Sequence, residues 1–121
     1  MTSVLESRAR ILAALAAGNV RTGTAGQFSA PCVLVEPGDP WAEWARMPGR
    51  VYRWRLTAVG GRADSEGSTT ALAELVDKVD AALLAPGTSR STQLPTWAMP
   101  LDQTLGGVAY AATVGTIQDT G

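Results

Sequence analysis

Residues 69–84 carry the pattern that most constrains the fold, because their large apolar residues follow the spacing of a helix with one buried stripe. The stripe consists of Leu72, Leu75, Val76, Val79 and Leu83. Burying each of these side chains contributes roughly 1.5–3 kcal/mol before conformational entropy is counted. Ser68 or Thr69 is expected to cap the helix, and Glu74 and Lys78 are spaced for a surface ion pair. The pattern therefore predicts the helix that holds the rest of the domain together.

Residues 51–59 (VYRWRLTAV) alternate with period two, which is typical of a strand with one buried face. The predicted buried face consists of Tyr52, Trp54, Leu56 and Ala58, and the opposite face carries Arg53, Arg55 and Thr57. This alternation separates Trp54 from the two arginines, so they do not form one stacking platform for nucleic acid. The polar face is expected to be solvated or to meet another subunit. Gly60 and Gly61 are expected to end the strand, with residues 60–68 as a polar loop.

A first helix is predicted over residues 3–17. Ser3 and Glu6 have the spacing of a capping box, and Gly18 followed by Asn19 is a typical stop signal. Its predicted apolar stripe consists of Val4, Leu5, Ile11, Leu12 and Leu15. Arg8 falls in the middle of this stripe. Two interpretations stay open for it: the side chain extends past the first turn into solvent, or it meets an acidic group of a partner.

Residues 31–36 (PCVLVE) predict a short strand, in which Cys32 is expected to be a small core residue. The next segment, residues 37–50 (PGDPWAEWARMPGR), holds three prolines and two glycines and predicts a long break. Trp41 and Trp44 lie in this break. Either they fold back over the core or they serve in a protein interface, where tryptophan is a favoured anchor.

Residues 96–101 and 108–117 predict two last strands joined by a turn over 102–107. The expected order is α-β-β-α-β-β. We therefore predict an α+β fold in which a mainly antiparallel sheet of about four strands carries both helices on one face. The length of 121 residues suits one domain, over residues 1–121.

The composition argues against the familiar catalytic and binding sites. The chain has no histidine, one cysteine and one lysine. With no histidine, the chain lacks the usual base that activates a serine nucleophile, and it lacks the Cys and His residues that form a zinc site. We therefore expect no catalytic, metal or cofactor site and no enzymatic activity. The net charge of −1 does not indicate a nucleic-acid partner. No segment approaches the ~20 apolar residues of a membrane span, so no membrane partner is expected.

The chain does resemble one family. The Pro- and Trp-rich segment PCVLVEPGDPW follows a short N-terminal helix and precedes the aromatic strand VYRWRLTAVGG. The helix TTALAELVDKVDAALL and the terminal strand GGVAYAATVGTIQ complete the series. This series resembles the tail terminator proteins of long-tailed, siphovirus-type phages, especially those of actinobacteria, over nearly the whole chain.

The resemblance implies a structural virion protein of the tail and neck, assembled in the cytoplasm of the bacterial host. Such proteins form a homohexameric ring that stops polymerisation of the tail tube and joins it to the head. The implied partners are other copies of the chain, the major tail tube protein and the head-completion (stopper) protein, with DNA passing through the lumen. Two alternatives stay open: another neck or tail protein, such as a head–tail connector or the tube itself, and a small nucleic-acid-binding module. The candidate interface residues are Arg8, Trp41, Trp44, Arg53, Arg55 and Arg62.

Overall fold

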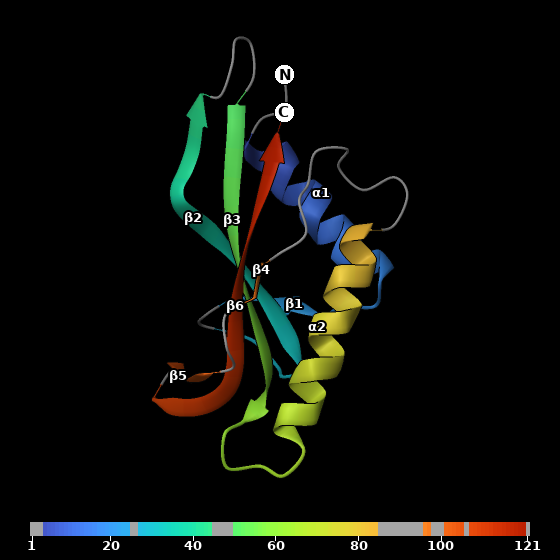
Figure 1. Ribbon diagram of the computed structural model, residues 1–121, viewed down its shortest axis with the longest axis vertical. Coiled ribbons are helices and arrows are strands. Elements are labelled where there is room, and N and C mark those ends of the chain that lie inside the picture. The colour runs from blue at the N-terminus through green and yellow to red at the C-terminus, as the bar shows by residue number, and fades with distance from the viewer. Residues whose placement is uncertain are drawn as a thin grey trace.

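The protein is a two-layer α+β domain, seen in a computed structural model that describes residues 4–24, 27–44, 50–84, 96–97, 101–105 and 107–120. The elements, in chain order, are α1 (Val4–Ala17), β1 (Thr22–Gly23), β2 (Cys32–Trp44), β3 (Arg50–Arg62), α2 (Ser68–Leu84), β4 (Thr96–Trp97), β5 (Leu101–Leu105) and β6 (Val108–Thr120). Both helices lie on one side of the sheet (Figure 1). The predicted α+β class, with two helices on one face, is confirmed.

The sheet is mostly antiparallel and is built around three long strands. Its strand order is β1-β2-β3-β6-β4, and β5 pairs separately with β6. Only the β1–β2 pair is parallel among the described pairs. β3 lies in the centre, between β2 and β6. The clear sequence alternation of β3 reflects its helix-facing side, on which Tyr52, Trp54, Leu56 and Ala58 are all buried.

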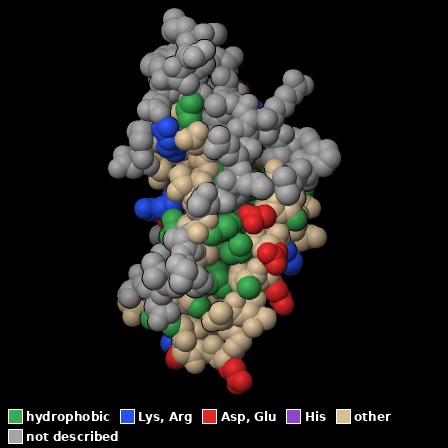
Figure 2. All heavy atoms as spheres, in the orientation of Figure 1, with side chains coloured by type: hydrophobic (Ala, Val, Ile, Leu, Met, Phe, Trp, Pro, Cys, Tyr) green, Lys and Arg blue, Asp and Glu red, His purple; other side chains and the backbone are tan. Residues whose placement is uncertain are grey.

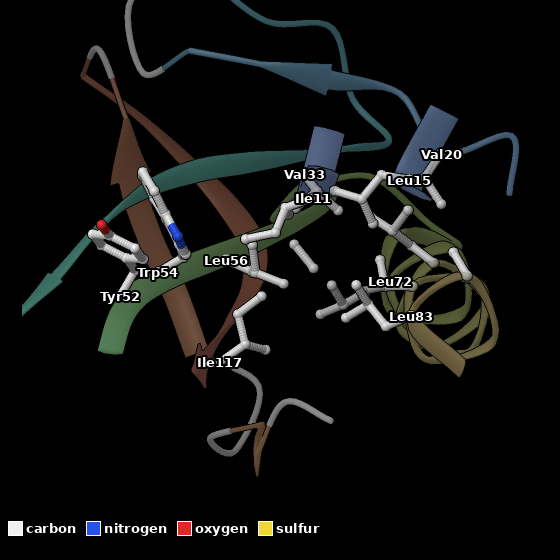
Figure 3. Close-up of a cluster of buried hydrophobic side chains, with 14 residues drawn as sticks. Ile11, Leu15, Val20, Val33, Tyr52, Trp54, Leu56, Leu72, Leu83 and Ile117 are labelled. Atoms are coloured by element: carbon white, nitrogen blue, oxygen red, sulfur yellow. The ribbon is translucent and has the colours of Figure 1, made fainter. Parts of the chain in front are cut away.

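The main core lies between the sheet and the two helices. Trp54, Tyr52 and Leu56 of β3 reach it from the sheet, as the alternation predicts. Figure 3 shows these side chains converging with Ile117 of β6 and with residues of both helices. The helical contribution consists of Ile11 and Leu15 from α1 and of Leu72, Leu75, Val79, Ala82 and Leu83 from α2. The predicted stripe of α2 is therefore confirmed, with Val76 half-buried at its margin.

The buried face of α1 differs from the predicted stripe at one position. Ile11 and Leu15 are buried as expected, but the side chain of Leu5 is 78% exposed. Ser7 is buried in its place, because its hydroxyl oxygen accepts a hydrogen bond of 2.9 Å from the indole Nε1 of Trp54. The expected cap at Ser3 lies outside the described residues. The buried face of α1 thus includes a polar residue that contacts the sheet, whereas the apolar Leu5 faces solvent.

The predicted break over residues 37–50 is wrong for its first half. β2 continues through Pro37 to Trp44 and pairs with β3 up to the Trp44–Arg50 register. The pairing shifts between Pro37 and Ala42, which marks a bulge or irregularity. Proline lacks a backbone donor and is tolerated in a sheet at bulges and on edge strands. β2 is such an edge here, because β1 pairs only with Val33 and Leu34 among the described strands.

The predicted end of β3 at Gly60 and the predicted turn over 102–107 also need correction. β3 continues to Arg62 with a register shift between Val59 and Gly61. A Cβ on Gly60 would lie 2.6 Å from the Cβ of Leu72, so this glycine lets α2 approach the strand. Gly60 and Gly61 therefore mark a close contact with α2 within the strand, and they do not mark the end of the strand.

The turn before β6 is shorter than predicted, because β5 extends from Leu101 to Leu105.

Candidate assembly surfaces

The side of the sheet that faces away from the helices carries a polar surface in the middle of the long strands. The register places Glu36 of β2, Arg55 of β3 and Thr116 of β6 in one row. The adjoining row holds Arg53 opposite Gln118. We call these five residues, Glu36, Arg53, Arg55, Thr116 and Gln118, the arginine face. All five are half-buried or exposed, so the predicted polar face is present at Arg53 and Arg55, but its third predicted member, Thr57, is buried.

An ion pair joins two residues of the arginine face. Arg55 Nη2 lies 3.2 Å from Glu36 Oε2, and the two side chains are 51% and 33% exposed. A pair this exposed to solvent contributes at most about 1 kcal/mol to stability. Trp54, which lies between the arginines in the sequence, is buried on the opposite side of the sheet. The predicted separation of the tryptophan from the arginines is therefore confirmed.

The same side of the sheet is covered at its other end, which the alternation did not predict. Cys32, Leu34, Val59 and Ala112 are fully buried there under Phe28, Ala30 and Tyr110. The rings of Phe28 and Tyr110 meet edge to face with centroids 5.3 Å apart. Burial raises the pKa of the Cys32 thiol, and the charge of Arg21 lowers it in part. Cys32 is a core residue, as predicted, and this end of the sheet does not extend the polar surface of the arginine face.

The outer surface of α2 is acidic. Glu74 and Asp77 are exposed on it together with Lys78, and Asp80 is half-buried beside them. Asp80 Oδ1 accepts a hydrogen bond of 3.0 Å from the indole Nε1 of Trp97 in β4. We call Glu74, Asp77, Lys78 and Asp80 the acidic face. Figure 2 shows acidic side chains gathered over α2 with a basic one beside them, and further basic side chains at the opposite edge of the view, where β2 and β3 lie.

Charge is also segregated along the chain. Residues 1–61 hold seven arginines and four acidic residues, whereas residues 62–84 hold five acidic and two basic residues. The small net charge of the whole chain conceals this asymmetry. The acids at positions 74, 77 and 80 are the sequence signal of an acidic helix surface, but they do not show which side of the sheet that helix covers.

The predicted interface residues do not form one site. Arg53 and Arg55 share the arginine face. Arg8 is exposed on α1, on the helical side of the sheet. Arg62 lies at the end of β3, where its Nε is 3.8 Å from Asp64 Oδ1 and both side chains are largely exposed. Trp41 and Trp44 belong to β2 by their backbone, and their side chains lie outside the described residues.

Neither a metal centre nor a membrane-spanning helix is found in the described parts of the chain. Within residues 4–24, 27–44, 50–84 and the described strands that follow, no three His, Cys, Asp or Glu residues lie close enough together to hold a metal ion. No described helix is long and apolar enough to cross a membrane. The chain matches no protein-family model and no curated protein.

Proposed function

We propose that this chain is a structural protein of a long-tailed phage that closes the end of the tail tube as a ring. In this role it stops polymerisation of the tube and presents the surface on which the head-completion protein docks. A role at the end of the tube is supported by the resemblance of the chain's segments to tail terminator proteins.

The observation that carries the ring is the presence of two surfaces of opposite charge on two sides of one domain (Figure 2). A closed ring of identical subunits is built from head-to-tail contacts, in which one surface of each subunit meets a different surface of the next. Such a subunit needs two complementary surfaces that point in different directions. The arginine face and the acidic face meet that requirement, because the sheet separates the first from α2.

The direct test of this function is the size and shape of the assembly. We expect native mass spectrometry to detect a hexamer, and negative-stain images to show rings, for the chain alone or with preassembled tubes of its tail tube protein. Rings at tube ends and tubes that no longer grow would support a terminator. Rings that stack into tubes would favour the tail tube protein instead. A monomer that binds DNA with strong salt dependence would overturn the proposal in favour of the nucleic-acid module.

The tryptophans of β2 give a first prediction on this assembly. Trp41→Ala and Trp44→Ala are each expected to weaken ring formation or capping of the tube, because tryptophan contributes more than most residues at protein interfaces. Sizing by light scattering and counting capped tubes in images measure the two effects. Leu5→Ala is the matched control, since it removes an exposed apolar side chain on α1. If rings and capping are unchanged in both tryptophan variants, these residues have no part in assembly.

A further inference from the structure

We propose that the acidic face of α2 in one copy of the chain docks on the arginine face of the next copy. The proposal rests on the ring proposed above for its biological setting. The contact itself is a statement about two copies and does not depend on the number of subunits. It identifies which surfaces meet, and it places a second layer of helix on the side of the sheet that the chain's own helices leave free.

The first support is that the two faces cannot meet within one molecule. α2 packs on the side of the sheet where Trp54 and Leu56 are buried. Arg53 and Arg55 occupy the alternate positions of β3 and therefore lie on the opposite side. The exposed acids of α2 point away from the sheet. Only a second molecule can bring these acids to the arginines.

The second support is complementarity of charge. Among the described side chains, the arginine face holds Arg53 and Arg55 against Glu36, which pairs with Arg55. The acidic face holds Glu74, Asp77 and Asp80 against Lys78. Docking between surfaces of opposite sign is favoured, whereas like charges that face each other across an interface oppose association. The arrangement therefore favours helix against sheet and disfavours the two symmetric pairings, helix against helix and sheet against sheet. That selection is what a head-to-tail contact requires.

The third support is the shape of the two surfaces. Ala73 and Ala81 are the exposed neighbours of the acidic residues on α2, so no long apolar side chain projects between the charges. The arginine face is the surface of three adjacent long strands. Helices pack readily on such a surface, as α1 and α2 do on its other side. The carboxylates of α2 can therefore contact the side chains of a flat sheet surface without a steric obstacle from their exposed neighbours.

Charge reversal tests the contact directly. Arg55→Glu makes both surfaces acidic, and Glu74→Lys together with Asp77→Arg makes both basic, so each of these two reversals is expected to weaken association of copies at least about tenfold. The variant that combines the two reversals restores opposite signs and is expected to associate within about threefold of the native chain. An equimolar mixture of the two reversed chains is also expected to associate, because subunits can alternate around an even-numbered ring. Sedimentation velocity at about 50 mM and about 500 mM salt measures each case.

Two further variants separate the contact from effects on the fold. Glu36→Gln breaks the same internal ion pair as Arg55→Glu but leaves both arginines, so association is expected to be retained. Arg21→Glu makes the same charge change at an exposed position outside both faces and is expected to have no effect on association. Thermal unfolding of every variant shows whether the domain is folded. Loss of association in Glu36→Gln together with Arg55→Glu would assign the effect to the internal pair and overturn the contact.

The outcomes distinguish this contact from the proposed function. Native rings that persist in both reversals would overturn the contact and leave the ring standing. Salt-sensitive pairs that respond to the reversals but never close into rings would support the contact and overturn the terminator function. A chain that stays monomeric alone and with tail tubes would overturn both. Binding of a DNA duplex to the monomer that is lost in Arg55→Glu would assign the arginine face to nucleic acid instead.

Discussion

At the scale of single residues, Trp54 connects the two layers of the domain. Its ring is buried in the core between β3 and the helices, with only 1% of the residue exposed. Its one polar atom, the indole Nε1, donates a hydrogen bond of 2.9 Å to the hydroxyl of Ser7 in α1. A buried donor without a partner is costly, so a tryptophan this deep in a core needs such an acceptor. The hydrogen bond explains why a serine occupies a fully buried position of α1.

Ser7→Ala is therefore expected to destabilise the protein by about 1–3 kcal/mol, because it removes a buried acceptor of the Trp54 indole. Denaturant unfolding followed by far-UV circular dichroism measures the change. Trp54→Phe removes the donor, and in its background Ser7→Ala is expected to cost less, so a double-mutant cycle isolates the pair. Ser29→Ala, at an exposed position, serves as the matched control. Equal costs of Ser7→Ala in the two backgrounds would show that the bond contributes nothing.

At the scale of elements, the end of α1 is defined by three consecutive residues. Asn19 has a φ of 60°, in the left-handed region that asparagine tolerates better than most residues. The amide of Val20 donates to the carbonyl of Leu15 at 2.9 Å, and that of Asn19 to the carbonyl of Ala16 at 3.0 Å. These two bonds form a Schellman motif, which ends the helix and buries Val20. Gly18 precedes the left-handed residue for another reason, namely contact with α2.

Gly18→Ala is expected to destabilise the domain by about 1–3 kcal/mol, since overpacking a well-packed contact costs that much. The added Cβ would lie 2.6 Å from the Cβ of Ala82 on α2 and would push the helices apart. Thermal unfolding measures the loss. Asn19→Gly keeps the left-handed turn at an exposed position and is expected to change stability by less than about 0.5 kcal/mol. If Gly18→Ala is as harmless as Asn19→Gly, the two helices are not in close contact there.

At the scale of the whole molecule, one core joins all the long elements. Residues of α1, α2 and the three long strands belong to the same buried cluster, so no element buries its apolar face alone. Trp97 of β4 is attached to α2 through Asp80, which ties the far edge of the sheet to the helical layer. The arginine face and the acidic face therefore belong to one domain with a shared core, which fixes their relative orientation.

This shared core predicts cooperative unfolding of the chain at concentrations where it is monomeric. Far-UV circular dichroism, which follows the helices, and fluorescence of the four tryptophans, which all belong to strands, are expected to give the same denaturation midpoint. Ser7→Ala is expected to shift both midpoints equally. Separate transitions for the two signals would mean that the helices leave the sheet before it unfolds, and the two faces would then not be held rigidly.

Much of this fold could be predicted from local patterns, and the candidate surfaces only in part. The buried stripe of α2 and the alternation of β3 were recognised correctly because each pattern is repeated within one element. The arginine face was recognised from the same alternation. The acidic face was not, because its meaning depends on which side of the sheet α2 covers. The path of β2 through Pro37 was also missed, since proline breaks a strand in general and is tolerated only at an edge or a bulge.

The sequence by itself determined the two periodic elements and the absence of histidine chemistry, because periodicity and composition are properties of neighbouring residues and of counts. Only the tertiary structure decided how Leu5 and Ser7 exchange places on α1, why Gly18 and Gly60 are glycines, and how β2 extends to Trp44. It also decided that the acids of α2 and the arginines of β3 lie on opposite sides of one sheet. These features depend on contacts between residues far apart in the chain, and no local pattern contains them.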